Sequence, residues 1–502
     1  MRIAFESSAS QPRRWCVVLA ERLEAQGHEV VLDRRTRPDG APLRARLDLL
    51  FMLERLLYGI AGPGPSQPAA WPPRLAQRDH ASCDLAIDFD GKAVAGAVDV
   101  PTLTPLYDGA PDEAAAMDAI LDGRAPRLSL ALRDPGDGAV RSVATALPAL
   151  PEPEIFTLSF DRVLSRMGTL LAQAVERFAA GRLDVLGQTA SPASGSPTPG
   201  ALRPLAFLAK SLAAKIGRRL THLTLRQDHW RIAWRWPAGD EVSSRLAWPS
   251  APYVFLPDDA RRFYADPFVL WHGGVAHVFC EEYPYATGKG VISVFNVERD
   301  GASSPPRIVL ERPYHLSYPM VFARDGAFFM IPETSANRTI EIYRASRFPD
   351  EWVLENVLVQ GVSAADATLV ERGGRLWLFA ALAEAGASSW DALGLFHATK
   401  LMGPWTPHAA NPVLVDAGSA RPGGMMFERD GALIRPAQDC RGGYGSALTL
   451  CRVDRLDPEH YAQTMLARLA PHPSWRADGV HTLNAAGGLE VIDCVGWRSR
   501  RA

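Results

Sequence analysis

One phrase recurs along this chain. ADPFVLWHGGVAHVFCEE (265–282) reads as an apolar strand, a turn with glycine and a second apolar strand, which is a β-hairpin signal. Aligned on the turn glycine, further copies are SYPMVFARDGAFFMIPET (317–334), ADATLVERGGRLWLFAAL (365–382), RPGGMMFERDGALIRPAQD (421–439) and a weaker HTLNAAGGLEVIDCVGW (481–497). Short strands that recur at roughly 40 to 50 residues indicate a repeat architecture.

Between the copies lie further strand patterns, such as GVISVFNV (290–297), TIEIYRA (339–345), LGLFHAT (393–399) and SALTLCRV (446–453). Two more strands per repeat make four-stranded units, and such units around an axis form the blades of a β-propeller. Five copies predict five blades. HWRIAWRW (229–236) precedes the first copy, and we expect it to be the outer strand that closes the ring with the C-terminal blade.

The first 186 residues show a different pattern, in which short apolar strands alternate with helical segments. Strands are predicted at 2–5, 29–32, 84–89 and 127–132, and helices at 15–26 and 161–180. This order predicts a Rossmann-like α/β domain with a mostly parallel sheet. The first strand is followed by ESSASQP without Gly-x-Gly-x-x-Gly, so the sequence does not favour a phosphate cradle.

The predicted organisation is therefore an α/β domain followed by an all-β domain. Residues 1–186 form the α/β domain, 187–200 a flexible linker rich in Ser, Pro and Gly, 201–228 a basic amphipathic helix, and 229–502 the propeller. Within 202–220, basic residues alternate with leucines and alanines at helical spacing: Lys210, Lys215, Arg218 and Arg219. Such a helix either lies on an anionic membrane surface or packs against a domain. Residues 48–60 raise the same choice.

The composition limits which partners and which cellular location we expect. The formal net charge is −2, which gives no electrostatic reason to expect nucleic acid. The start lacks a signal-peptide pattern and no window reaches about 18 apolar residues, so we expect a soluble cytoplasmic protein, with peripheral binding at the inner membrane face as the alternative. The six cysteines include no Cys-x-x-Cys pair, which excludes the usual zinc and redox motifs and predicts buried thiols.

The hairpins predict where a site lies. Both ends of each hairpin emerge on one face of the disc, so the residues at these ends, most of them polar, line one funnel. They are Asp266, Tyr318, Asp366, Arg421 and His481 at the first ends, Glu281 or Glu282, Glu333, Ala381 and Gln438 at the returns, and Arg435, Asp439 and Asn484 nearby. These positions differ between copies while the strand interiors stay apolar, which favours a binding site over a pure scaffold.

Many phrases in one order carry a family resemblance: YADPFV, GKGVISV, YHLSYPMVF, MIPETS, FPDEW, DATL, GPWTPHAANPV, RPGG and LIRPAQDCRGGYG. Over roughly 230–493 the chain resembles the N-terminal domain of plant glucosamine inositolphosphorylceramide transferase and its bacterial relatives. More remotely it is similar to the five-bladed arabinanase, levansucrase and invertase type of carbohydrate enzyme. In the bacterial relatives a formyltransferase-like region often precedes this domain, so the resemblance implies a degenerate formyltransferase-like domain at 1–186. The His-x-Ser-Leu-Leu-Pro phrase of formyltransferases is missing from this sequence.

The resemblance also implies chemistry. Glycosidic bonds are usually cleaved or formed by two carboxylic groups, one acid and one base or nucleophile. Asp266 matches the base or nucleophile of the propeller glycosidases, Tyr318 stands where they carry a second aspartate, and Asp366 where they carry the acid. We expect Glu333 to replace that acid if burial raises its pKa. Arg421 and Arg435 suit a phosphate or carboxylate clamp.

Each of these residues has a structural alternative. Asp266 before proline caps a strand, the pairs of Arg421, Arg435 and Asp439 hold blades together, and Trp377 is either a sugar platform or blade core. His481 is either a ligand of a structural cation in the propeller centre or a hydrogen-bonded core residue. No cofactor and no catalytic metal is predicted.

The function predicted from these residues is sugar transfer in surface polysaccharide or glycolipid biosynthesis. Asp266, Glu333 and Asp366 are the candidate catalytic residues; Glu282, Tyr318, Arg421, Arg435, Gln438, Asp439, His481 and Asn484 are the candidate substrate-binding residues. The expected partners are a sugar or nucleotide-sugar donor and a glycan or glycolipid acceptor. A non-catalytic glycan-binding or scaffold module and a furanosidase-type glycoside hydrolase stay open as alternatives.

Overall fold

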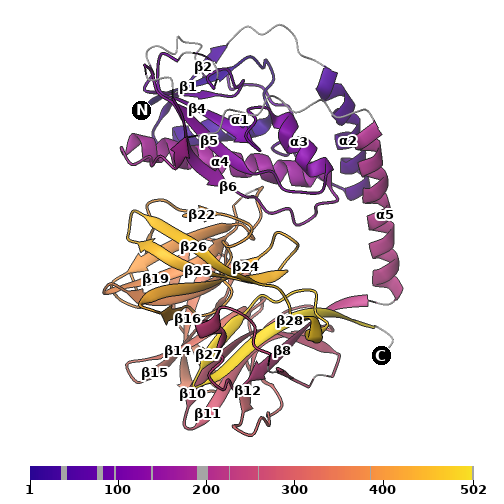
Figure 1. Cartoon of the computed structure of the whole chain (residues 1–502), viewed down its shortest axis with the longest axis vertical. Coiled ribbons are helices and arrows are strands. Elements are labelled where there is room, and N and C mark those ends of the chain that lie inside the picture. The colour runs from indigo at the N-terminus through magenta and orange to yellow at the C-terminus, as the bar shows by residue number, and fades with distance from the viewer. Residues whose placement is uncertain are drawn as a thin grey trace. The chain divides into compact units, whose positions relative to one another are not determined.

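The computed structural model describes the chain except residues 35–41, 76–82, 95, 97, 137–138, 189–201, 225, 251, 258, 385 and 500–502. It divides into two units: Met1–Arg219 with Ala385–Ser388, and Leu220–Glu384 with Ser389–Ala502. The predicted linker at 187–200 lies outside the described residues from 189 onward. Figure 1 shows the helices of the first unit and the strands of the second.

The first unit is built on one mixed sheet. Its strand order is β2-β1-β3-β4-β5-β6-β7, and the strands are β1 Arg2–Ser7, β2 Glu29–Arg34, β3 Leu85–Asp88, β4 Thr102–Tyr107, β5 Leu128–Arg133, β6 Val140–Ala146 and β7 Gly187–Gln188. Only the β2-β1-β3-β4 part is parallel; β5, β6 and β7 pair antiparallel. The prediction of a mostly parallel Rossmann-like sheet was therefore too simple. β5 runs antiparallel to β4 although helix α3 lies between them in sequence, and β6 pairs antiparallel with β5, the strand that precedes it.

Among the described residues, the helices of this unit are α1 Arg14–Ala25, α2 Pro42–Tyr58, α3 Glu113–Leu121, α4 Phe156–Ala179 and most of α5 Leu202–Thr224, whose last residues belong to the second unit. Helix α4 buries 15 of its 24 residues, most of them apolar. Its start is held from α2, where buried Glu54 accepts hydrogen bonds from the backbone N–H groups of Phe156 and Thr157 at 3.0 and 2.7 Å. The carboxylate thus satisfies donors that the first helical turn leaves open.

The second unit is a five-bladed β-propeller, as the repeat predicted. Blades 1 to 4 are consecutive in sequence. Blade 1 comprises β10 Arg262–His272, β11 Val275–Pro284, β12 Val291–Val297 and β13 Arg307–Leu310, and blade 2 comprises β14 Ser317–Arg324, β15 Ala327–Glu333, β16 Thr339–Arg347 and β17 Glu351–Gln360. Blade 3 comprises β18 Ala364–Arg372, β19 Arg375–Leu382, β20 Ala392–Ala398 and β21 Thr406–Pro407, and β22 Leu414–Val415 also pairs with β20. Blade 4 comprises β23 Phe427–Arg429, β24 Ala432–Asp439, β25 Ala447–Leu456 and β26 Tyr461–Leu469.

The fifth blade joins the two ends of this unit. Its order is β27-β28-β8-β9, with β27 Leu483–Ala486 and β28 Leu489–Ser499 from the C-terminal part, and β8 Arg226–Arg235 and β9 Val254–Phe255 from the beginning of the unit. The predicted closing segment at 229–236 is therefore the third strand of the blade, and β9 is the outer one. The ring closes as β8 pairs with β28 over ten residue pairs.

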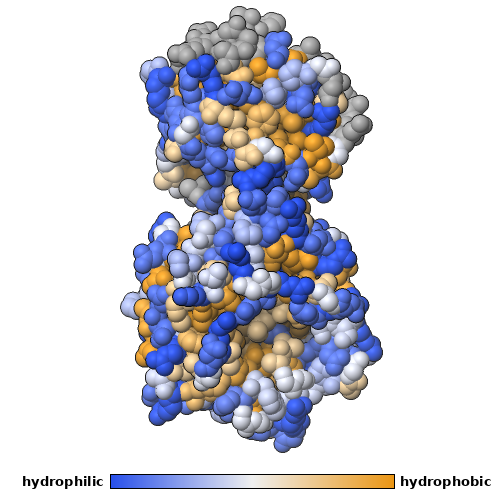
Figure 2. Space-filling model, turned by 90° about the vertical axis from the view of Figure 1, so that its left-hand side faces the viewer, coloured by the Kyte–Doolittle hydropathy of each residue, from blue (hydrophilic) through white to orange (hydrophobic). Residues whose placement is uncertain are grey.

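Apolar side chains of neighbouring blades form the core of the propeller. Phe268 and Ile292 of blade 1 pack in one cluster with Met320, Met330 and Tyr343 of blade 2. Trp377 is buried in the cluster of blade 3, which is the structural alternative given above. On the face shown in Figure 2, hydrophobic residues lie among hydrophilic ones, as is usual for a protein surface.

Candidate active site

Three candidate residues share an uncommon backbone conformation. Asp266, Tyr318 and Asp366 have φ of 51°, 45° and 57°, and occupy equivalent places in β10, β14 and β18. At each place the hairpin register shifts, as in a β-bulge. A left-handed residue other than glycine costs on the order of 1 kcal/mol, and such strain concentrates at functional sites. The bulges thus lie within the inner strands, not at their first residues as the sequence predicted.

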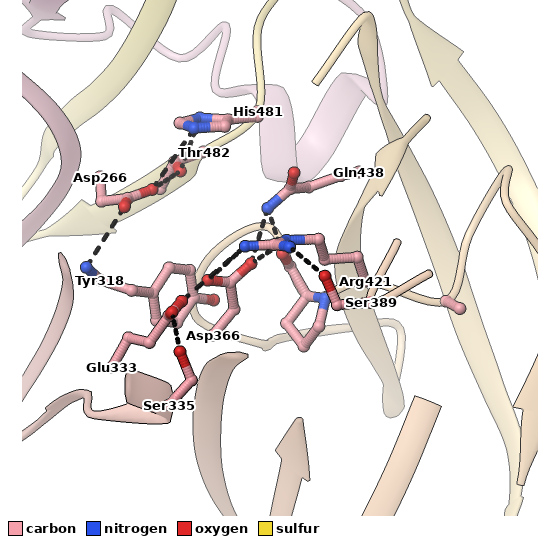
Figure 3. A network of polar contacts seen from close by, with 12 residues as sticks. Asp266, Tyr318, Glu333, Ser335, Asp366, Ser389, Arg421, Gln438, His481 and Thr482 are labelled. Atoms are coloured by element: carbon pink, nitrogen blue, oxygen red, sulfur yellow. Dashed lines mark hydrogen bonds and ion pairs between the residues drawn. The ribbon is translucent and has the colours of Figure 1, made fainter. Parts of the chain in front are cut away.

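Asp266 is buried among polar groups from other blades (Figure 3). Its Oδ1 accepts a hydrogen bond from Thr482 Oγ1 at 3.0 Å and lies 3.7 Å from His481 Nε2; its Oδ2 accepts one from the Tyr318 N–H at 3.2 Å. Burial, together with the carboxylates of Asp366 and Asp493, outweighs the effect of His481 and raises the pKa of Asp266 to about 6.

His481 is oriented by a residue that the sequence analysis missed. Its Nδ1 lies 2.7 Å from Asp493 Oδ2, and its ring stacks on Trp230 at 3.8 Å with 16° between the planes. Burial alone would lower the pKa of His481, but Asp493 and Asp266 raise it. The only available signal was a single acidic residue inside the apolar strand segment VIDCV. Asp493, His481 and Asp266 therefore form a carboxylate–imidazole–carboxylate series.

Asp366 belongs to a second group. Arg421 donates to both of its oxygens, from Nε at 2.6 Å and from Nη2 at 3.3 Å, and Gln438 Nε2 donates to Oδ2 at 2.8 Å (Figure 3). Burial raises the pKa of Asp366 to about 6, against the opposing effect of Arg421. Arg421 Nη2 also lies 3.8 Å from Glu333 Oε2, and Glu333 Oε1 accepts a hydrogen bond from Ser335. One guanidinium thus links two candidate carboxylates.

Glu281 of β11 lies near the other candidate carboxylates. It is buried, and its Oε1 lies 3.4 Å from His315 Nε2. Burial and the carboxylates of Asp266, Glu333, Asp493 and Asp366 raise the pKa of Glu281 well above its ordinary value. Glu282 is occupied elsewhere, because Arg262 pairs with its Oε1 and Ser293 Oγ donates to its Oε2 at 2.6 Å. The sequence left these two residues as alternatives for the hairpin return and gave Glu282 as the substrate-binding candidate; the structure instead places Glu281 near the other candidate carboxylates.

The remaining candidates make contacts within the protein framework. Arg435 is buried and donates to the carbonyls of Ser419 and Ala420 and to Gln463. The other contacts are Asp439 with Arg441 and Arg468; Asn484 with Pro267 O and Met425 N; and the Tyr318 hydroxyl with Thr368 Oγ1 and the Gly424 N–H. These side chains hold the inner strands, and Arg435 is not placed as a phosphate clamp.

A central cation was predicted as an alternative role for His481. Asp266, His481 and Asp493 each offer a ligand atom, and these atoms lie within 4.8 Å of one another. Asp493 already accepts backbone N–H groups: those of His481 and Thr482 at Oδ1, 3.1 and 3.0 Å, and that of Asp266 at Oδ2, 2.8 Å. His481 Nδ1 faces Asp493 as well. The protein's own contacts thus occupy Asp493 and the Nδ1 of His481, which leaves fewer ligand atoms for a cation.

Comparison with known proteins gives one family match. The family profile described as "Glucosamine inositolphosphorylceramide transferase 1, N-terminal" matches residues 243–481. Glucosamine inositolphosphorylceramide transferase 1 of Oryza sativa subsp. japonica is 34% identical over 235 residues, which are 45% of this chain and 32% of the relative. The Arabidopsis thaliana protein of that name is 30% identical over 249 residues, 48% of this chain and 32% of the relative. The chain thus spans about a third of the length of these relatives.

Among solved structures, the chain is similar to a family 117 glycoside hydrolase of Zobellia galactanivorans. The TM-score is 0.35 at 12% identity, covering 53% of this chain and 90% of the hydrolase. A GH43_1 enzyme from Xanthomonas citri has a TM-score of 0.35 at 13% identity, covering 47% and 87%.

Proposed function

We propose that the propeller is a glycosyltransferase of surface polysaccharide or glycolipid biosynthesis, with its active site in the funnel. The observation that carries this proposal is the group of carboxylic acids from different blades that lie close enough to interact electrostatically, of which Asp266, Glu281 and Asp366 are buried and have raised pKa values. Buried acids with mutually raised pKa values are typical of catalytic sites. The glycolipid acceptor is inferred from the name of the plant relatives.

In this proposal Asp266 is the base. It takes the proton of an acceptor hydroxyl as that oxygen attacks the anomeric carbon of the donor. His481, held by Asp493, lies beside Asp266 and stabilises the charge that the base carries before the proton arrives. Thr482 and the Tyr318 N–H fix the orientation of the carboxylate.

Glu281 is the proton donor to the leaving oxygen. Burial and the neighbouring carboxylates raise its pKa well above the ordinary value, which favours the protonated carboxyl group that an acid catalyst needs. The sequence assigned this role to Glu333, but Glu333 has Ser335 and Arg421 as partners. Glu333 and Asp366 instead hold the buried guanidinium of Arg421.

The test measures transfer from UDP-linked hexoses and hexosamines to inositolphosphorylceramide in detergent. Asp266→Asn and Glu281→Gln should each lower turnover roughly 10²- to 10⁴-fold, the usual contribution of a general acid or base. Asp430→Asn is the matched control, because Asp430 is also an aspartate with positive φ, 51°, but is exposed in a turn. Turnover by folded Asp266→Asn at the parent rate would sink the mechanism.

A non-catalytic glycan-binding module is the second candidate. Both oxygens of Asp266 and of Asp366 already have donors within the protein, which suits a fixed framework. In that case a glycan array should show binding that survives the combined change Asp266→Asn, Glu281→Gln and Asp366→Asn, with no turnover of any donor. Release of free sugar without an acceptor would instead favour the hydrolase alternative.

Other predictions belong to the same proposal. We infer a cytoplasmic protein whose residues 1–186 are a degenerate formyltransferase-like domain, joined to the propeller through 187–228. Fractionation of cells that express the tagged chain tests the location. Binding of folate-type formyl donors to residues 1–186 tests the formyltransferase-like character.

A further inference from the structure

Helices α2 and α5 are joined side by side in the first unit (Figure 1). Tyr58 near the end of α2 bonds through its hydroxyl with Ser211 of α5, 2.6 Å from Oγ and 3.2 Å from the carbonyl oxygen. Lys215 of α5 donates to Leu57 O, and its ammonium lies 4.5 Å from the centre of the Tyr58 ring. The two helices therefore form one surface element, which the sequence did not predict.

The inner faces of both helices are attached to the rest of the unit. On α5, Phe207 meets Phe156 edge-on at 6.1 Å, and Arg203 pairs with Asp118 and Asp122 at 3.0 and 2.7 Å. On α2, Glu54 is buried at the start of α4. The inner faces of both helices thus pack against the rest of the unit, which is one of the two alternatives that the sequence left open. The outer faces do not take part in this packing.

The outer faces are apolar. On α2 the exposed side chains follow helical spacing at Leu49, Met52 and Leu56, with Met52 at 59% and Leu56 at 81% of full exposure. On α5 the corresponding exposed residues are Leu205, Leu212 and Ile216, with the exposed alanines 206, 209 and 213 beside them. Single exposed apolar residues are ordinary, but stripes of large ones on two neighbouring helices mark an interaction surface.

Charge indicates what this surface contacts. The segment 202–224 contains five basic residues, Arg203, Lys210, Lys215, Arg218 and Arg219, and no acidic residue. Lys210 is exposed beside the apolar stripe of α5. A helix whose exposed apolar face lies beside an exposed lysine suits the interface of a membrane that contains anionic lipids. Among the described residues, no helix is long and apolar enough to cross a bilayer.

We propose that the outer faces of α2 and α5 together bind the surface of an anionic lipid membrane. The leucines, Met52 and Ile216 enter the boundary between headgroups and acyl chains, and Lys210 pairs with lipid phosphates. This surface is independent of the funnel carboxylates. If the propeller acts on a glycolipid, the same surface keeps the protein on the membrane that holds its acceptor.

The test is co-sedimentation of the full chain with vesicles of phosphatidylcholine, alone or mixed with phosphatidylglycerol. We expect binding to the mixed vesicles at low salt, weaker binding at high salt, and little binding to phosphatidylcholine. Leu212→Ser with Ile216→Ser should weaken binding at least roughly tenfold, because two inserted side chains are lost. Lys210→Glu should also weaken it.

The matched control changes two similarly exposed apolar residues of the propeller, Ile308→Ser with Leu354→Ser, and should bind as the parent does. Equal binding to both vesicle types, or unchanged binding by the α5 variant, would overturn the proposal. Sedimentation velocity without lipid tests whether a second copy of the chain covers this surface instead. If the parent were a dimer and Leu212→Ser with Ile216→Ser were a monomer, the surface would be a dimer interface and the membrane proposal would be overturned. Asp266→Asn should bind vesicles normally, so failure of the funnel mechanism and failure of the membrane surface are distinguishable.

Discussion

At the scale of single residues, the site depends on backbone conformations that side chains rarely adopt. The left-handed bulges at Asp266, Tyr318 and Asp366 interrupt three inner strands at the same level. The ladder on either side of each bulge holds the strained residue in place. As a result, Asp266 and Asp366 are buried where an ordinary strand would place apolar side chains.

Burial of Asp266 predicts a pH-dependent stability. Its pKa is raised to about 6 in the folded protein, so the stability that protonated Asp266 contributes is present below about pH 4 and is lost as pH rises through about 6. Asp266→Asn imitates the protonated form and should lose less stability over this range, with a difference on the order of 2 kcal/mol. The difference is measured as the free energy of unfolding of both proteins by chemical denaturation at about pH 4, 6 and 7, which spans this range. Asp430→Asn should follow the parent; parallel curves for Asp266→Asn and the parent would contradict the assignment.

Gly424 gives a second prediction at this scale. Its φ is +129°, and a Cβ there would lie 2.1 Å from Leu483 O, a backbone atom of blade 5. Gly424→Ala should therefore lower the free energy of unfolding by about 3 kcal/mol or more, since the clash requires backbone movement. Gly431→Ala is the control: its φ is +74°, and nothing lies within 4 Å, so about 1 kcal/mol is expected. If urea denaturation showed equal losses in the free energy of unfolding for both variants, the backbone of blade 5 at Leu483 would move away from the new Cβ at little cost.

At the scale of elements, the hairpin is the unit that builds the propeller. Each turn glycine lets two apolar strands pair, and the next two strands extend the blade outward. Blade 5 differs, because its third strand, β8, comes from the other end of the unit. Ring closure therefore depends on a pairing between residues more than 250 positions apart, such as Glu490 with Arg235.

This closure predicts a large effect of one buried residue of β8. Ile232 is fully buried between blades 5 and 1. Ile232→Ala should cost about 2 to 5 kcal/mol, the usual range for such a cavity, whereas Ile308→Ala on exposed β13 should change stability by less than about 0.5 kcal/mol. Tryptophan fluorescence during urea denaturation measures both. A small effect of Ile232→Ala would show that β8 contributes little to the ring.

At the scale of the whole molecule, the two units have separate cores. The propeller contains every candidate funnel residue, and the first unit contains the surface formed by α2 and α5. The proposed chemistry and the proposed membrane binding are thus assigned to different parts of the chain. Loss of one is not expected to remove the other.

This separation predicts the behaviour of a fragment. Residues 220–502, expressed alone, contain all strands of the propeller, including β8 and β9. The fragment should unfold cooperatively and keep donor and glycan binding, but should lose binding to anionic vesicles. Calorimetry and the vesicle assay measure these properties. A fragment that aggregates, while the full chain is soluble, would show that the first unit is needed for the propeller to fold.

The sequence by itself determined the repeat, and with it the five blades, the hairpins and the residues that mark the inner strands, because apolar alternation and turn glycines are local signals. It also brought Asp266, Glu333, Asp366, Arg421, Gln438 and His481 together as one group. It did not determine which of Glu281 and Glu282 faces the funnel, because neighbouring residues of a strand point to opposite sides and pairing with β10 sets the choice. The role of Asp493 was decided only by the tertiary structure. It lies 227 residues from Asp266 in sequence, and only ring closure places its carboxylate where it accepts a hydrogen bond from the Asp266 backbone N–H.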